Sequence, residues 1–96
     1  MTRVEIKPLT YHLNDEFWTF LQDDAGGSYL LVEVEQSAVT YNRLIRLNEQ
    51  ELADIHGLGW VALQYVAHRV HYFADEYSKR AIRGETLEQA GAAART

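Results

Sequence analysis

The most informative stretch of the sequence is residues 59–83, which read GWVALQYVAHRVHYFADEYSKRAIR. Apolar and aromatic residues recur in this stretch at i, i+3, i+4 and i+7, a spacing that places them on one face of a helix. We therefore expect one long helix from Gly59 to Arg83, with this face turned toward the core. The residues of the face are Trp60, Leu63, Val66, Ala67, Val70, Phe73, Ala74 and Tyr77.

A second stripe lies on the same predicted helix, about a third of a turn away. It contains Tyr65, His68, Tyr72 and Glu76. Tyrosine is enriched in protein interfaces because its ring covers a large area while its hydroxyl remains polar. Two interpretations stay open: the stripe is an interface, or it closes the margin of the core. As an interface its simplest partner is a second copy, so we expect a homodimer with Tyr65 and Tyr72 near the contact.

The first half of the chain predicts an antiparallel sheet. Residues 4–7 (VEIK) and 29–35 (YLLVEVE) show the alternation of apolar and charged residues that is typical of strands. Residues 40–47 (TYNRLIRL) predict another strand, and residues 16–21 (EFWTFL) predict a strand with a helix as the alternative. The turn signal DDAGGS, residues 23–28, predicts a hairpin. The expected sheet side of the core is Leu30, Val32, Val34, Ile45 and Leu47.

A short helix is predicted between the sheet and the long helix. Asn48 and Glu51 have the spacing of a capping box, and Gly57 is the expected C-cap after an end near Ile55 or His56. The expected fold is α+β: an antiparallel three- to four-stranded sheet packed on one long C-terminal helix, with its other face toward solvent. Residues 1–84 are expected to form a single domain. Residues 85–96 have little to bury and predict a flexible tail.

Composition narrows the function classes. The 96 residues include 14 acidic and 9 basic side chains, giving a net charge of -5, and no cysteine. The basic residues form no patch, so we expect no direct nucleic-acid binding. No apolar run has the length of a signal peptide core or a membrane span, which predicts a cytoplasmic protein that binds no membrane. An acidic surface suits a protein partner with a basic surface.

The sequence contains no recognisable catalytic constellation or nucleotide-binding motif, so we expect a non-enzymatic protein without a cofactor. One alternative is a small metal- or ligand-binding domain that uses His68, His71 and Asp75, which fall on adjacent turns of the predicted helix. The third metal ligand would have to come from elsewhere, and the usual pair of histidines at i and i+4 is absent. For these histidines, a surface position without a metal is the simpler interpretation.

A small, acidic, cysteine-free α+β domain of this kind resembles bacterial immunity proteins and phage-encoded inhibitors of host defence, although no individual residue carries the resemblance. The resemblance implies a binding module that inhibits or regulates another protein. An accessory domain with purely structural contacts stays open beside it. The residues expected to bind the partner are Glu33, Glu35, Tyr65, His68, Tyr72, Asp75 and Glu76.

Overall fold

The computed structural model describes residues 12–14, 17–23, 26–36 and 38–94. The strands are β1 (His12–Asn14), β2 (Trp18–Gln22), β3 (Ser28–Gln36), β4 (Val39–Arg46) and β5 (Ala81–Ile82). The helices are α1 (Glu49–Leu58), α2 (Trp60–Tyr72), the 3₁₀ helix η1 (Ala74–Arg80) and α3 (Glu85–Ala94). All strand pairs are antiparallel, in the order β1-β2-β3-β4-β5, which confirms the α+β class and the antiparallel sheet. The strand predicted at residues 4–7 lies outside the described residues.

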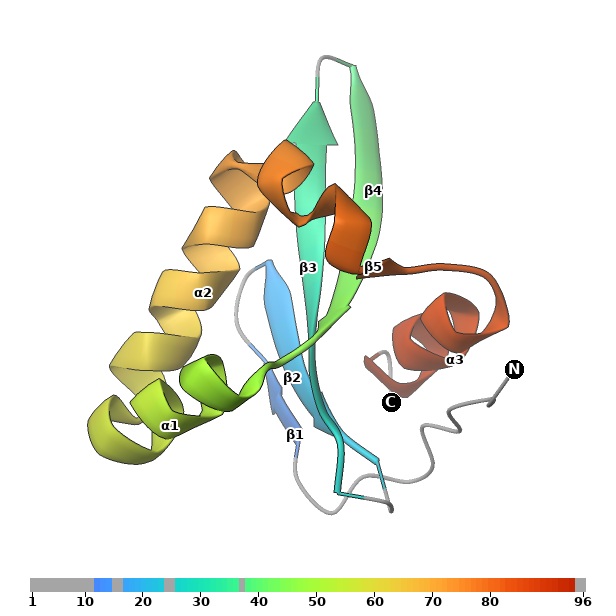
Figure 1. Ribbon diagram of the computed structural model, residues 1–96. Helices are drawn as coiled ribbons and strands as arrows, with labels where there is room; N and C mark the ends of the chain where they lie inside the picture. The colour runs from blue at the N-terminus through green and yellow to red at the C-terminus, as the bar shows by residue number, and fades with distance from the viewer. Residues whose placement is uncertain (1–11, 15–16, 24–25, 37, 95–96) are drawn as a thin grey trace.

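Helical layers cover both faces of the sheet. Helices α1 and α2 lie on one side and α3 lies on the other (Figure 1). Strand β3 contributes side chains to the cores on both faces of the sheet, because successive side chains of a strand point to opposite faces. Leu30 belongs to the core under α2, whereas Leu31 belongs to the core under α3. The expectation that one face of the sheet meets solvent is therefore wrong where α3 packs, although Glu33 and Glu35 farther along β3 are exposed on that face.

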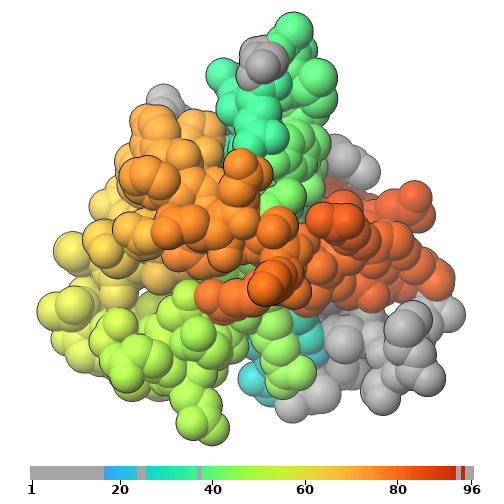
Figure 2. Space-filling view, turned by 45° about the horizontal axis from the view of Figure 1, so that its top comes forward, coloured from blue at the N-terminus to red at the C-terminus, as the bar shows by residue number. Residues whose placement is uncertain are grey.

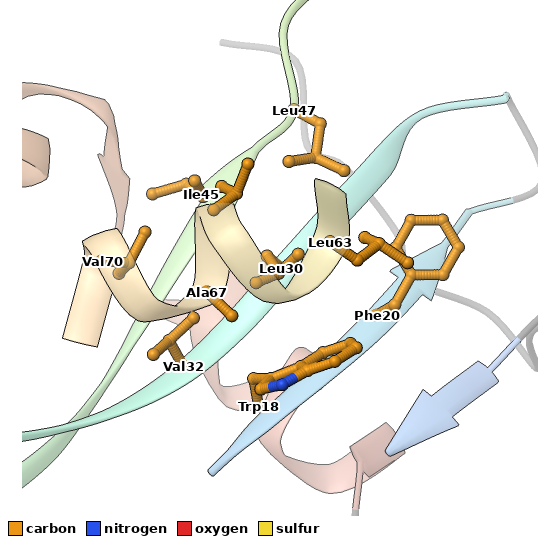
Figure 3. Close-up of a cluster of buried hydrophobic side chains, with 10 residues drawn as sticks. Trp18, Phe20, Leu30, Val32, Ile45, Leu47, Leu63, Ala67 and Val70 are labelled. Carbon is orange, nitrogen blue, oxygen red and sulfur yellow. The ribbon is translucent and has the colours of Figure 1, made fainter. Parts of the chain in front are cut away.

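The larger core lies between the sheet and α2 (Figure 3). All five predicted sheet residues of this core are buried, as are five of the predicted helix residues, Leu63, Val66, Ala67, Val70 and Ala74. Trp18 and Phe20 of β2 join them, which settles residues 18–22 as a strand rather than a helix. Trp60 and Phe73, predicted for the core, are instead exposed.

The smaller core lies under α3 and corrects the prediction of a flexible tail. Residues 85–94 form a helix whose Ala90 is completely buried against the sheet. Leu87 and Ala94 pack beside it, because the spacing of three to four residues aligns them with Ala90 on one helix face. The sheet side of this core consists of Leu21, Tyr29, Leu31 and Leu44. The small alanine-rich face allows α3 to approach an otherwise exposed apolar sheet surface.

The start of α1 is fixed by the predicted capping box. The side chain of Asn48 accepts a hydrogen bond from the Glu51 amide at 2.8 Å, and the Asn48 amide donates to the Glu51 carboxylate at 2.9 Å. The end of α1 differs from the prediction. Gly57 remains helical, and Gly59 is the C-cap with a φ of 64°. This left-handed conformation favours glycine and lets α2 begin directly at Trp60.

The long helix predicted from Gly59 to Arg83 is wrong, because α2 ends at Tyr72. A straight continuation would carry the chain about 16 Å beyond Tyr72 by residue 83. The chain instead turns through η1 and returns to the sheet, where Leu44 pairs with Ile82 and Ile45 with Ala81. Arg43 supports this turn by donating to the Ala74 carbonyl. Ala74 is buried and Tyr77 packs against the core, so these two positions of the predicted apolar face are confirmed although the straight helix is wrong.

An ion pair ties η1 to α1. The guanidinium of Arg80 donates to both carboxylate oxygens of Glu51, at 3.0 and 2.6 Å, and to the Arg46 carbonyl at 2.9 Å. Figure 2 shows the η1 surface (orange) next to that of α1 (yellow-green). Burial by itself would raise the pKa of Glu51, but hydrogen bonds from Arg80 and from the Asn48 amide hold this pKa below its ordinary value. Arg80 therefore joins η1 to the first turn of α1 through Glu51.

The depressed pKa predicts an acid-dependent loss of stability. The pair contributes at neutral pH, and its contribution falls as pH drops below the ordinary glutamate value of 4.5 and through the lower pKa of the folded state. Glu51→Gln is expected to lower the free energy of unfolding by about 1–3 kcal/mol at neutral pH and to flatten this acid dependence. Urea titrations over the acid range provide the measurement. Glu49→Gln, an exposed change in the same first turn, is the control, and equal effects of the two variants would contradict the assignment.

Within the described residues, no helix is long and apolar enough to cross a membrane.

Candidate functional site

The outer face of α2 carries a continuous exposed stripe of large side chains. Val61, Tyr65, His68 and Tyr72 fall within about 60° of one another around the helix axis, at 100° per residue. Val61 is 65% exposed, Tyr65 63% and Tyr72 69%. The buried residues of α2 lie on the opposite side of the helix, against the sheet. We call these four residues the outer stripe.

The spacing within the outer stripe is four, three and four residues. This is the spacing of the apolar seam through which helices pack on one another in coiled coils. Large exposed apolar and aromatic side chains that gather on one face are typical of a contact site. The stripe therefore has the geometry that a partner helix or apolar groove requires.

A cluster of rings joins the outer stripe to the sheet. Phe17, just before β2, contacts His68 edge-on at 5.1 Å between ring centroids and His71 at 4.5 Å. His68 stacks on Tyr72, and Tyr72 meets His71 edge-on at 4.7 Å. Nδ1 of His71 lies 2.6 Å from the Glu33 carbonyl, so it carries the proton and donates to that oxygen. These contacts hold His68 and Tyr72 in place before any partner arrives.

The opposite border of the outer stripe is an ion pair. Arg69 contacts the Glu76 carboxylate at 2.8 Å and lies over the Phe73 ring at 5.2 Å. Glu76 thus stays beside the stripe although it belongs to η1 rather than to α2. Asp75, another predicted partner-binding residue, precedes Glu76 in η1. Its carboxylate accepts a hydrogen bond from the Gln36 amide at 3.5 Å.

The predicted partner-binding residues do not form one surface. Tyr65, His68 and Tyr72 lie together, and Asp75 and Glu76 follow at the end of the helix. Glu33 and Glu35 are exposed on β3, but their side chains alternate with those of Val32 and Val34. They therefore point to the α3 side of the sheet, away from α2. The sequence grouped them with the helix by charge alone, and charge carries no information about the face.

The structure gives no support to the metal alternative within its described residues. There, no group of three or more histidine, cysteine, aspartate or glutamate side chains could hold a metal ion. Nδ1 of His71 is engaged by the Glu33 carbonyl, and Asp75 bonds to Gln36. His68, His71 and Asp75 are therefore not assembled as a set of ligands.

Sequence reasoning missed Val61 and Phe17 as parts of the site. Val61 could have been found from its spacing of four residues before Tyr65, which extends the stripe by one turn. Phe17 gave no such signal, because its contact with His68 and His71 depends on how β2 packs beside α2. Only the tertiary structure brings these residues together.

Comparisons with protein-family models, with curated proteins and with solved structures found no significant match.

Proposed function

We propose that this chain is a non-enzymatic protein-binding module that inhibits or regulates a partner protein through the outer stripe of α2. The observation that carries the proposal is the exposure of Val61, Tyr65 and Tyr72 on one face of a helix whose other face is fully packed. Burying such rings against a partner removes apolar area from water. Aromatic anchors of this kind supply much of the binding energy in known interfaces.

The chemistry of the surface defines the partner. Apolar and aromatic side chains form the centre, so the partner contributes an apolar groove or the apolar face of a helix. The net charge of -5 favours a partner with basic residues around that contact. Salt is expected to slow association by screening this attraction, with a smaller effect on dissociation, which depends on the buried rings.

Site-specific photo-crosslinking tests the proposed surface. A photoreactive phenylalanine derivative replaces Tyr65 or Tyr72 in separate variants, which are expressed in the native host and irradiated. Both positions are expected to give the same protein adduct. The matched control is the same substitution at Val39, which is 61% exposed at the start of β4 and does not belong to the outer stripe.

Each outcome of that experiment decides a part of the proposal. An adduct that forms from positions 65 and 72, and disappears when an excess of unlabelled chain competes, supports the outer stripe as the binding site. An adduct from position 39 alone, or none from the helix, refutes it. The purified partner is then assayed with and without the chain. Binding that leaves the partner's activity unchanged would refute inhibition or regulation.

The same surface predicts weak self-association. In a two-fold antiparallel pairing of α2 with its copy, Tyr65 lies near the second His68 and Val61 near the second Tyr72. The outer stripe would bury roughly 500 Å² per protomer, below the ~800 Å² per partner of a standard interface. We therefore expect a dimer that forms at tens of micromolar and dissociates on dilution, measured by light scattering.

A double variant tests this self-association. Tyr65→Ala with Tyr72→Ala is expected to give the mass of one chain at every concentration while circular dichroism stays unchanged. A wild-type mass of one chain at tens of micromolar would exclude the dimer. A dimer that persists in the double variant would place its interface elsewhere, such as at a sheet edge.

A further inference from the structure

A pocket of about 430 Å³ lies at the end of the larger core, and none of its lining residues belongs to the outer stripe. It forms because α1 and α2 meet at Gly59 and diverge, leaving space above the ends of β2 and β3. This volume is within the range of small-molecule sites in proteins. Neither the core nor the proposed docking surface requires the pocket, so its role has to be sought in the binding of a small molecule.

The walls of the pocket are apolar and partly aromatic. Phe20 and Leu63, both buried, line it, and Ile55 of α1 lines its other side. The indole of Trp60 also lines the pocket and is supported by Trp18 at 5.1 Å between ring centroids. Flat aromatic walls favour a flat ring, because rings gain from offset and edge contacts beyond the area that they bury.

One wall of the pocket is polar. Ser28 is only 4% exposed, and its hydroxyl accepts a hydrogen bond from the Gln22 amide at 3.2 Å. The Ser28 hydroxyl and the Gln22 amide both line the pocket, so this pair offers a donor and an acceptor to a molecule that enters it. Both side chains lie on the sheet face that carries the pocket, since they share alternation with Leu30 and Phe20. A ligand carbonyl can accept the Ser28 hydroxyl proton, and the Gln22 side-chain oxygen can accept from a ligand N–H.

Charge excludes one class of ligand. Among the residues that the structure describes, the pocket lining contains no aspartate, glutamate, lysine or arginine, and His56 is its one titratable side chain. An ionic ligand would lose its hydration there and would meet no permanently charged side chain among these residues. The pocket therefore suits a neutral molecule.

We propose that this pocket binds a small neutral aromatic amide or lactam. The ligand ring lies between Trp60 and the aliphatic side chains of Ile55 and Leu63. The ligand carbonyl accepts a hydrogen bond from the Ser28 hydroxyl, and the ligand N–H donates to the side-chain oxygen of Gln22. The proposal is independent of the function assigned to the outer stripe, because the two sites share no residue.

Titration with the two-ring lactam carbostyril tests the proposal, read by amide chemical shifts and tryptophan fluorescence. Saturable shifts are expected at Ser28, Gln22 and the Trp60 indole. Ser28→Ala is expected to weaken binding about 3–10-fold, the range for one neutral hydrogen bond. Ile55→Trp should abolish binding by filling the pocket, with folding checked by circular dichroism. Tyr65→Ala, on the outer stripe, should leave the affinity unchanged.

Two results would overturn the proposal. One is the absence of saturable shifts at millimolar carbostyril, or shifts that centre on the outer stripe. The other concerns charge: quinaldate, a two-ring carboxylate, is expected to bind more weakly than carbostyril, and equal or tighter binding would refute the neutral-ligand assignment. Equal affinities of the wild type and Ser28→Ala would refute the role of the hydroxyl.

Discussion

Ending the chain at Gly84 is expected to leave it largely unfolded or aggregated. The truncation removes α3 and uncovers Leu21, Tyr29, Leu31 and Leu44, which are at most 6% exposed in the intact chain. Exposing parts of four such side chains costs on the order of 5 kcal/mol, and this is comparable with the whole stability of a small domain. Urea unfolding followed by circular dichroism, with binding of a hydrophobic dye, measures the effect.

Two controls separate the packing of α3 from the mere shortening of the chain. A chain ending at Ala94 keeps the helix and should retain the wild-type free energy of unfolding. Glu88→Ala changes an exposed residue of α3 and should alter this free energy by no more than about 0.5 kcal/mol. If the chain ending at Gly84 unfolds at the same urea concentration as the full chain, α3 does not cover the sheet in solution.

Gly27→Ala is expected to lower the free energy of unfolding by about 2–3 kcal/mol through a buried hydrogen-bond network. Asp23 accepts from the Gly27 amide at 2.6 Å and from the Tyr29 hydroxyl at 2.7 Å. An added Cβ at residue 27 would lie 2.8 Å from the Asp23 carboxylate and 2.9 Å from the Tyr29 hydroxyl, closer than such atoms approach. The network must therefore shift, and the buried groups lose part of their hydrogen bonding.

The matched control is Gly57→Ala, in α1, where an added Cβ meets nothing within 4 Å. This change should stabilise the protein by about 0.5–1 kcal/mol, because alanine favours helix more than glycine does. In a Tyr29→Phe background, which removes one clashing oxygen, Gly27→Ala should cost less than in the wild type. Equal costs in the two backgrounds would show that the strain does not involve the Tyr29 hydroxyl.

The alkaline behaviour of Tyr29 provides an independent check of this network. Burial, followed by the hydrogen bond to Asp23 and its negative charge, raises the pKa of Tyr29 from 10.0 to about 12. The folded state therefore favours the neutral phenol. Stability that depends on it is complete below pH 10.0 and is lost as pH rises toward 12. Tyr29→Phe should remove this part of the alkaline loss of stability.

The sequence by itself predicts the elements that depend on interactions between residues close together in the chain. The capping box of Asn48 and Glu51, the hairpin at residues 23–28 and the alternation of β3 were all predictable. Each depends on contacts between near neighbours, namely a cap, a turn or the two faces of one strand. The sheet side of the larger core follows from the same alternation.

The tertiary structure decided where the chain turns and what covers the sheet. Residues 60–83 contain no glycine or proline to end a helix, yet α2 ends at Tyr72. Its end depends on the pairing of Ile82 with Leu44 and on the bond from Arg80 to Glu51, which join segments far apart in sequence. The tail after Gly84 is too weakly apolar to predict a packed helix. It packs because β3 turns Leu31 toward it, and burial against the sheet overrides the weak local signal.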